Sequence, residues 1–192
     1  LDKIMKLQRP DGGFAWFDGM PSSPYITLEI MLNMARLNKM TGGDLLTSHL
    51  SPLTSAIRYL DLEISRDFDR LKKYNKDYQK QNCIDNSQLF YLHMRSEYPN
   101  IPVAEFAREA HAFYTAQAEK YWTSFTLYGK AMMAVVAQRN GKTKIVDQIM
   151  KSLRENALKT DEFGMYWAKN TAGYFWNERP VAVQAAMIEA FT

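Results

Sequence analysis

Apolar and polar residues alternate with a helical period along most of this chain. In segment 52–78 apolar residues recur every three or four positions and charged residues fill the positions between them, as in a helix with one buried face. Segment 142–158 has the same pattern, whereas segments 25–37, 124–139 and 181–191 are apolar on most sides. The sequence therefore predicts an all-α fold in which buried helices alternate with amphipathic ones.

Residues typical of helix ends delimit these segments. Pro24 and Pro180 suit the first turn of a helix, where the missing N–H costs no intrahelical hydrogen bond. Asp85 can cap a helix that ends before Pro99, and another helix is expected over residues 102–120. With the helical pattern at residues 1–8, these seven segments give about eight helices.

A glycine-aromatic loop occurs twice, each time ahead of an apolar helix. The first copy is Gly13-Phe-Ala-Trp16-Phe17 and the second is Gly164-Met-Tyr-Trp167. We expect each glycine to let the backbone turn tightly while the aromatic residues pack against it. A single loop-and-helix unit cannot bury its apolar face alone. The pattern therefore predicts a toroid-like array of helical hairpins, with inner and outer rings of helices and about eight helices forming an incomplete ring.

Aromatic residues in and around these loops are the candidate binding residues. The interpretation that the pattern favours is that they cap the hydrophobic interior and fix the geometry of the hairpins. Two alternatives are that they line a ligand pocket, or that exposed members dock other domains. The residues concerned are Trp16, Phe17, Tyr25, Trp167, Tyr174 and Trp176.

Composition narrows the possible functions. The chain has 192 residues, 46% of them hydrophobic, which indicates one globular domain over residues 1–192. The formal charge of +3 is spread among acidic residues, so no nucleic-acid partner is expected. No apolar run approaches the roughly 20 residues that span a bilayer, and we expect no membrane contact by this segment. Because both ends lie within helical patterns, we expect a segment of a larger multidomain chain.

Cysteine and histidine give little sign of metal or redox chemistry. Cys83 is the single cysteine in the sequence, so it forms no internal disulfide. His49, His93 and His111 are scattered and lack the spacing of metal ligands. We therefore expect neither a metal nor another cofactor.

Several motifs, in this order, carry a resemblance to a known family. The run Gly13-Phe-Ala-Trp-Phe-Asp-Gly-Met is followed by Tyr25-Ile-Thr-Leu-Glu-Ile, and later by Tyr121-Trp122, Gly164-Met-Tyr-Trp167, Gly173-Tyr-Phe-Trp176 and the segment 180–191. This order resembles the α/α-toroid, or thioester-containing, complement-like domain of bacterial α2-macroglobulin-family proteins. The resemblance covers nearly the whole chain and is weakest over residues 45–98.

The resemblance implies a non-catalytic role in an endopeptidase inhibitor that traps host or competitor proteases. It further implies a periplasmic, cell-surface or secreted location, with target proteases and neighbouring β-sandwich domains of the same chain as partners. The Cys-Gly-Glu-Gln type of thioester motif is absent, because Cys83 is followed by Ile84-Asp-Asn86. We therefore expect no thioester in this chain. Some relatives use a histidine of this part of the toroid for acyl transfer, which makes His111 the candidate.

Enzyme functions are the alternatives. Segment 8–14 is similar to the repeat of terpene cyclases, but the nearest aspartate pair, Asp67 and Asp69, has the pattern of a charged surface. A carbohydrate-active enzyme or glycan-binding module on an α/α toroid is the stronger alternative. Glycoside hydrolysis needs two carboxylates about 5 to 9 Å apart. The candidate carboxylates are Asp11, Asp18, Asp161, Glu162 and Glu178. This alternative requires that two of them converge across an open groove.

Overall fold

The computed structural model describes residues 2–43, 49–171 and 179–192, and these residues are mostly helical. They form eight α-helices, two short 3-10 helices and one two-stranded sheet. The chain divides into two compact units, Leu1–Thr115 and Ala116–Thr192. The predicted all-α class is confirmed, and the arrangement of the helices in a toroid stays a prediction.

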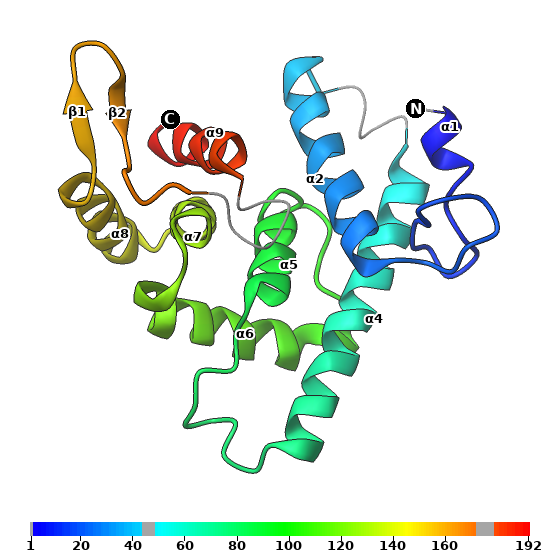
Figure 1. The fold of residues 1–192 in the computed structure, drawn as a ribbon. Helices are drawn as coiled ribbons and strands as arrows, with labels where there is room; N and C mark the ends of the chain where they lie inside the picture. The colour runs from blue at the N-terminus through cyan, green and yellow to red at the C-terminus, as the bar shows by residue number, and fades with distance from the viewer. Residues whose placement is uncertain (1, 44–48, 172–178) are drawn as a thin grey trace. The chain divides into compact units, whose positions relative to one another are not determined.

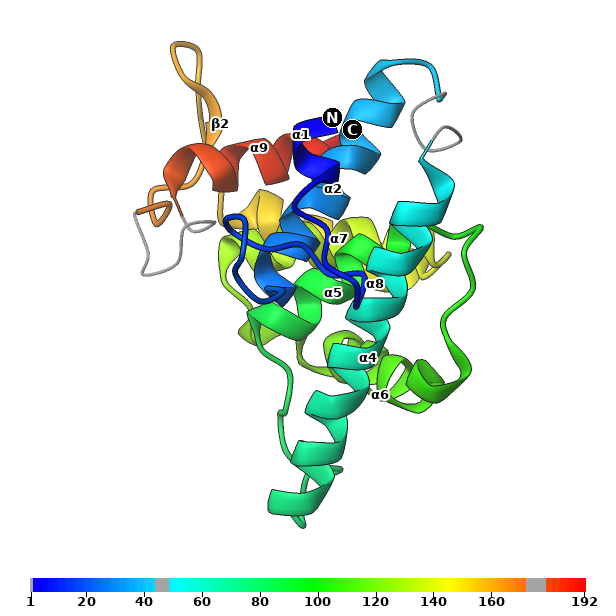
Figure 2. The same cartoon turned by 90° about the vertical axis from the view of Figure 1, so that its right-hand side faces the viewer.

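Unit 1 is built around three helices, α2 (Pro24–Met40), α4 (Leu50–Tyr74) and α5 (Asn86–Ser96). They pack against one another (Figures 1 and 2). The short helix α1 (Asp2–Met5) precedes them, and η1 (Glu105–Ala107) and the first part of α6 (Arg108–Tyr121) follow. The side chains that fill the core of unit 1 include Met31, Leu32, Leu53, Ile57, Leu60, Leu89 and Met94.

The helix starts of unit 1 follow the residues that predicted them. Pro24 occupies the first turn of α2, and the Ser23 hydroxyl accepts a hydrogen bond from the N–H of Ile26 at 3.4 Å. Asp85 caps α5 by accepting from the N–H of Ser87 at 2.7 Å, while the Gln88 side chain accepts from the N–H of Asp85 at 2.8 Å. This reciprocal pair is a capping box. The predicted start of α5 is thus confirmed.

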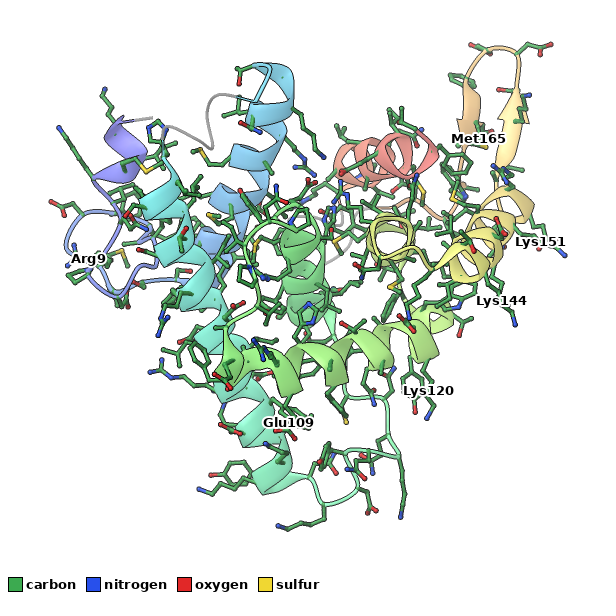
Figure 3. All side chains as sticks on the ribbon, turned by 180° about the vertical axis from the view of Figure 1, so that it is seen from behind. Arg9, Glu109, Lys120, Lys144, Lys151 and Met165 are labelled. Carbon is green, nitrogen blue, oxygen red and sulfur yellow. The ribbon has the colours of Figure 1, made fainter. Side chains whose placement is uncertain are left out.

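Unit 2 is organised around α7 (Leu127–Arg139), which contacts both α8 (Thr143–Glu155) and α9 (Pro180–Phe191). The 3-10 helix η2 (Trp122–Ser124) leads into α7. Residues 131–137 are all buried, so the prediction that this helix is buried on most sides is confirmed. On α8, Ile149 and Leu153 are buried, whereas Lys144 and Lys151 point away from the unit (Figure 3).

The structure corrects several predicted boundaries and faces. The amphipathic pattern of segment 142–158 predicts that Leu158 faces inward at the end of a helix, but Leu158 is 48% exposed and begins strand β1 (Leu158–Thr160). This strand pairs antiparallel with β2 (Gly164–Tyr166). The segment expected to be helical from residue 102 becomes α-helical only at Arg108.

Helix α9 also differs from its prediction. Its residues Val181 and Ile188 are 82% and 64% exposed, so this helix has an open apolar face rather than burial on most sides. Among the residues that the structure describes, no helix combines the length and the apolar character needed to cross a membrane.

Candidate functional site

The first glycine-aromatic loop is a closed and heavily hydrogen-bonded turn. The N–H of Arg9 donates to the carbonyl of Gly13 at 2.8 Å, and the N–H of Ala15 donates to the carbonyl of Leu7 at 3.2 Å. The Gln8 side-chain amide donates to the carbonyl of Gly12 at 2.9 Å and to that of Pro52 at 2.8 Å. The loop is therefore closed on itself and tied to the first turn of α4.

Two adjacent glycines allow this closure for different reasons. Gly12 has a φ of +92°, and a Cβ there would lie 2.4 Å from the carbonyl oxygen of Ser55. Gly13 has no such φ, but its Cβ would lie 2.7 Å from the Cβ of Ser22 and 2.8 Å from the ring of Tyr59. The turn predicted at Gly13 is thus made by Gly12, and Gly13 is needed for space.

Phe14 anchors the loop in the core of unit 1. Its side chain is fully buried, and its N–H donates to the hydroxyl of Thr27 at 2.8 Å. The Thr27 hydroxyl in turn donates to the carbonyl of Ser23 at 2.8 Å, and the N–H of Ser23 donates to the carbonyl of Phe14 at 2.8 Å. Because a buried N–H needs a partner, Thr27 fixes the position of Phe14 at the start of α2.

The neighbouring aromatic residues lie on the surface. Trp16 is 49% exposed, Phe17 70% and Tyr25 37%. The rings of Trp16 and Tyr25 are stacked, with centroids 6.2 Å apart and an angle of 20° between their planes. The interpretation that these residues cap the interior is therefore wrong for Trp16 and Phe17. We call the exposed residues Trp16, Phe17, Met20 and Tyr25, of which Trp16 and Tyr25 are in ring contact, the aromatic platform.

The second glycine-aromatic loop has the opposite arrangement. Gly164 begins β2 with a φ of +66°, which agrees with its predicted role in a tight turn. Trp167 is buried, and its indole N–H donates to the carbonyl of Leu153 at 2.8 Å. This tryptophan packs inside unit 2, with its ring 6.1 Å from that of Phe191. Tyr174 and Trp176 lie outside the described residues.

The carboxylates considered for glycoside hydrolysis have mostly structural partners. Asp11 accepts from the N–H of Gly13 at 3.0 Å and from the hydroxyl of Ser22 at 2.6 Å. Asp18 accepts from the N–H of Gly19 at 2.9 Å and lies 3.7 Å from the Arg9 guanidinium. Asp161 and Glu162 are exposed in the turn between β1 and β2, and Glu178 lies outside the described residues. Asp11 thus stabilises its own loop.

Unit 1 contains a buried polar cluster that the sequence pattern does not indicate. Asp61 on α4 accepts from the hydroxyl of Tyr91 at 2.7 Å and from the N–H of Ala104 at 2.9 Å. Arg95 places its Nε 3.7 Å from Asp61 and donates from its Nη2 to the carbonyl of Ile101 at 2.7 Å. These bonds hold the connection between α5 and η1 against α4. Removing one member would leave a buried charge without compensation.

His111, the candidate acyl-transfer residue, lies beside this cluster. Its half-buried ring meets the ring of Tyr91 edge-on, with centroids 6.0 Å apart. Burial lowers the pKa of His111, and the positive charge of Arg95 lowers it further, while Asp61 partly offsets both effects. The imidazole is therefore neutral at pH 7, the form that can act as a base or nucleophile.

Cys83 has no feature of a reactive thiol. It is partly buried, and burial raises its pKa, so the protonated form prevails at neutral pH. Its sulfur lies 3.5 Å from the carbonyl oxygen of Tyr78.

A pocket of about 250 Å³ opens between α2, α4 and α5. Its apolar wall includes Leu28, Leu60 and Ile64. Charged residues also line it, among them Asp67, for which the sequence pattern predicts a charged surface. The sequence of α4 alone gives no signal for this pocket, because the pocket forms only where α2 and α5 pack against α4.

Comparisons with family models, curated proteins and solved structures find no match to this chain.

Proposed function

We propose that this chain is a non-catalytic part of the α/α-toroid domain of a bacterial α2-macroglobulin-like protease inhibitor. In this proposal it acts in the periplasm, at the cell surface or after secretion, as an interaction module of a larger chain that traps proteases. The observation that carries the proposal is the aromatic platform, which is exposed although the loop beneath it is fixed. The choice of family rests on the resemblance carried by the order of the glycine-aromatic motifs in the sequence.

The proposal is supported by the contacts that hold the loop backbone beneath the aromatic platform. The loop uses the buried Phe14, the tightly packed Gly12 and Gly13 and the Gln8 side chain to hold its backbone. Exposed aromatic rings on a fixed backbone lose little conformational entropy on binding, and such residues often dominate the energetics of interfaces. We infer that the platform docks a neighbouring β-sandwich domain of the same chain.

His111 has a secondary place in this proposal. A neutral imidazole suits acyl transfer, but the chain lacks the thioester motif that would supply the acyl group. Any such chemistry would need a thioester elsewhere in the full-length protein. We therefore propose a structural and interaction role for the chain, with His111 as the residue to test if the full-length protein carries a thioester.

The first test is protease trapping by the full-length protein. A trapped protease keeps its activity on a small peptide substrate and loses it on a large protein substrate. We expect the double variant Trp16→Ala, Phe17→Ala to weaken this loss several-fold, because the platform no longer docks. Tyr74→Ala is the matched control, since Tyr74 is also an exposed aromatic residue, at 76%, but lies outside the platform.

The outcomes separate the parts of the proposal. If the full-length protein traps no protease, the proposed function is wrong. If it traps protease and the platform variant behaves like the control, the function stands and the docking role is wrong. The intact mass with and without methylamine then tests for a thioester: a methylamine adduct that prior protease treatment abolishes indicates covalent capture, and no adduct indicates trapping by enclosure.

A further inference from the structure

The pocket between α2, α4 and α5 has features of a binding site that the proposed function does not use. Its wall of Leu28, Leu60 and Ile64 is apolar, and its polar side is formed by acidic residues of α4 and by the start of α5. These elements all belong to unit 1 and pack directly against one another (Figure 2). The pocket is therefore a defined feature of one compact unit.

Asp67 is held firmly in the pocket lining. Its Oδ2 accepts hydrogen bonds from the Gln88 amide at 2.7 Å and from the Tyr114 hydroxyl at 2.8 Å. Both donors are neutral, so they fix the carboxylate without cancelling its charge. Its Oδ1 lies 3.3 Å from Arg70, whose side chain is 70% exposed. Water screens a pair as exposed as this one, and it is weak.

The charges of the lining do not balance. Glu63, Asp67 and Asp85 line the pocket together with one cation, Arg70, so the lining has two formal negative charges in excess. Arg66 pairs with Glu63 at 2.7 Å from outside the lining and is 61% exposed. Within the described residues, Asp85 forms no ion pair. A cleft with an excess of one charge next to apolar walls attracts a ligand of the opposite charge.

The size of the pocket limits the ligand. Its volume of about 250 Å³ lies just below the range of roughly 300–1,000 Å³ for sites that enclose a small molecule. Ser87, Asp85 and Arg70 at its rim are exposed, so the pocket is open to a group that enters from outside. A lysine or arginine side chain fits this description, because its methylene stem can pack on apolar walls while its charged end stays near polar groups.

We propose that this pocket binds a single cationic side chain, lysine or arginine, inserted by a polypeptide partner. The apolar stem lies along Leu28, Leu60 and Ile64, and the cation lies among Asp67, Asp85 and Glu63. The partner's backbone remains outside, at the rim. This inference does not depend on the proposed function, since it rests on the shape and charge of unit 1 alone.

The test is titration of the 192-residue, isotope-labelled chain with blocked tripeptides, followed by amide chemical shifts. The probes are glycine-lysine-glycine, glycine-arginine-glycine and the neutral analogue glycine-norleucine-glycine. We expect the two cationic probes to shift the amides of residues 60–70 and 85–91 and to bind at least about threefold more tightly than the neutral one. Added salt should weaken the binding of the cationic probes, because it screens the attraction.

Asp85→Asn is the best variant, because asparagine caps a helix about as well as aspartate and only the charge is lost. It should weaken lysine binding about threefold or more. Asp67→Asn should do the same, and if it fails to fold, Glu63→Gln replaces it. Asp69→Asn is the matched control, since Asp69 is an exposed aspartate of the same helix that pairs with Lys72 and does not line the pocket.

Three results would overturn the proposal. The neutral probe binding as tightly as the cationic ones would make the pocket a purely apolar site. If folded Asp85→Asn and Asp67→Asn bind the lysine tripeptide as tightly as the unchanged chain, the carboxylates do not contribute to binding. Shifts confined to other parts of the chain would place the cation elsewhere.

Discussion

The two glycine-aromatic loops have similar sequences but opposite structures. In the first, Phe14 is buried and Trp16 and Phe17 are exposed, at 49% and 70%. In the second, Trp167 is buried, and Phe163, which directly precedes Gly164, is 69% exposed. The first loop is closed by side-chain and backbone bonds to α2 and α4, whereas the second is a short hairpin of two three-residue strands. Each loop therefore has one aromatic anchor, at a different place in the motif.

This difference shows that the number of aromatic residues in a loop does not say which one is the anchor. The anchor is the residue whose polar groups also find partners inside. The N–H of Phe14 reaches the Thr27 hydroxyl, and the indole N–H of Trp167 reaches the carbonyl of Leu153. Trp16, Phe17 and Phe163 have no comparable place in the core and are exposed on the surface, available for contacts with other molecules.

The largest effect is expected on removing the anchor of the first loop. Phe14→Ala should lower the free energy of unfolding by about 3–5 kcal/mol, because it deletes a fully buried ring and leaves a cavity. Phe163→Ala, directly before the second loop, should change it by less than about 0.5 kcal/mol, because that ring is exposed. Chemical denaturation of the two variants, followed by near-UV circular dichroism, measures both values. Equal losses would contradict the assignment of anchors.

Replacing the glycine should also cost more stability in the first loop than in the second. Gly12→Ala should cost about 2–4 kcal/mol, since it adds a clash with the Ser55 backbone to an unfavourable φ. Gly164→Ala has open space around it and should cost about 1 kcal/mol, from φ alone. Unfolding of both variants in parallel gives the comparison. A larger loss at Gly164 would mean that close packing does not constrain the first loop.

A smaller effect is expected from the tryptophans. Trp167→Phe keeps most of the ring but removes the hydrogen bond to the carbonyl of Leu153, and should cost about 1–3 kcal/mol. Trp16→Phe should change the stability by less than about 0.5 kcal/mol. Thermal unfolding distinguishes the two variants. If Trp16→Phe destabilised the chain as much as Trp167→Phe, the aromatic platform would be part of the core.

The smallest effect is expected for Tyr59, whose ring lies beside Gly13 of the first loop. This effect is absent at neutral pH. Burial and the charges of Glu63 and Asp11 raise the pKa of Tyr59 to about 12, against about 10 in an unfolded chain. The folded state thus holds the hydroxyl proton of Tyr59 more tightly than the unfolded chain does. The contribution of this proton to the free energy of unfolding is therefore full below about pH 10 and is lost as the pH rises towards about 12. Tyr59→Phe should lose less stability over that interval, measured by denaturation at several pH values. An unchanged pH dependence would contradict the raised pKa.

The sequence predicted the helices well because their signals are local. Of the apolar positions predicted for α4, Leu53, Ile57, Leu60, Ile64 and Phe68 are buried, as their spacing required, and Leu71 is partly buried. Helix starts at Pro24, Asp85 and Pro180 follow from the chemistry of the first turn. The hairpin of β1 and β2 was missed, because three residues are too few to show a two-residue period.

The site was less predictable because it depends on contacts between distant residues. Asp61 occupies an ordinary position on a charged helix, and only its hydrogen bonds to Tyr91 and Ala104 show that it is buried. Phe14 and Trp16 are equally plausible anchors in the sequence. Their roles are decided by Thr27, thirteen residues after Phe14. Asp67 belongs to a pocket because α5 lies against it, which the helical pattern of α4 cannot indicate.

The two hydrogen bonds of the Gln8 amide also bear on how unit 1 opens. One amide group joins the loop carbonyl of Gly12 to the carbonyl of Pro52 in the first turn of α4. Fraying of that turn would release the loop, and opening of the loop would leave the turn without its partner. Amide hydrogens of both segments should therefore exchange together, as one cooperative unit. The aromatic platform would then be present or absent as a whole, so its binding strength would depend on the opening equilibrium of α4.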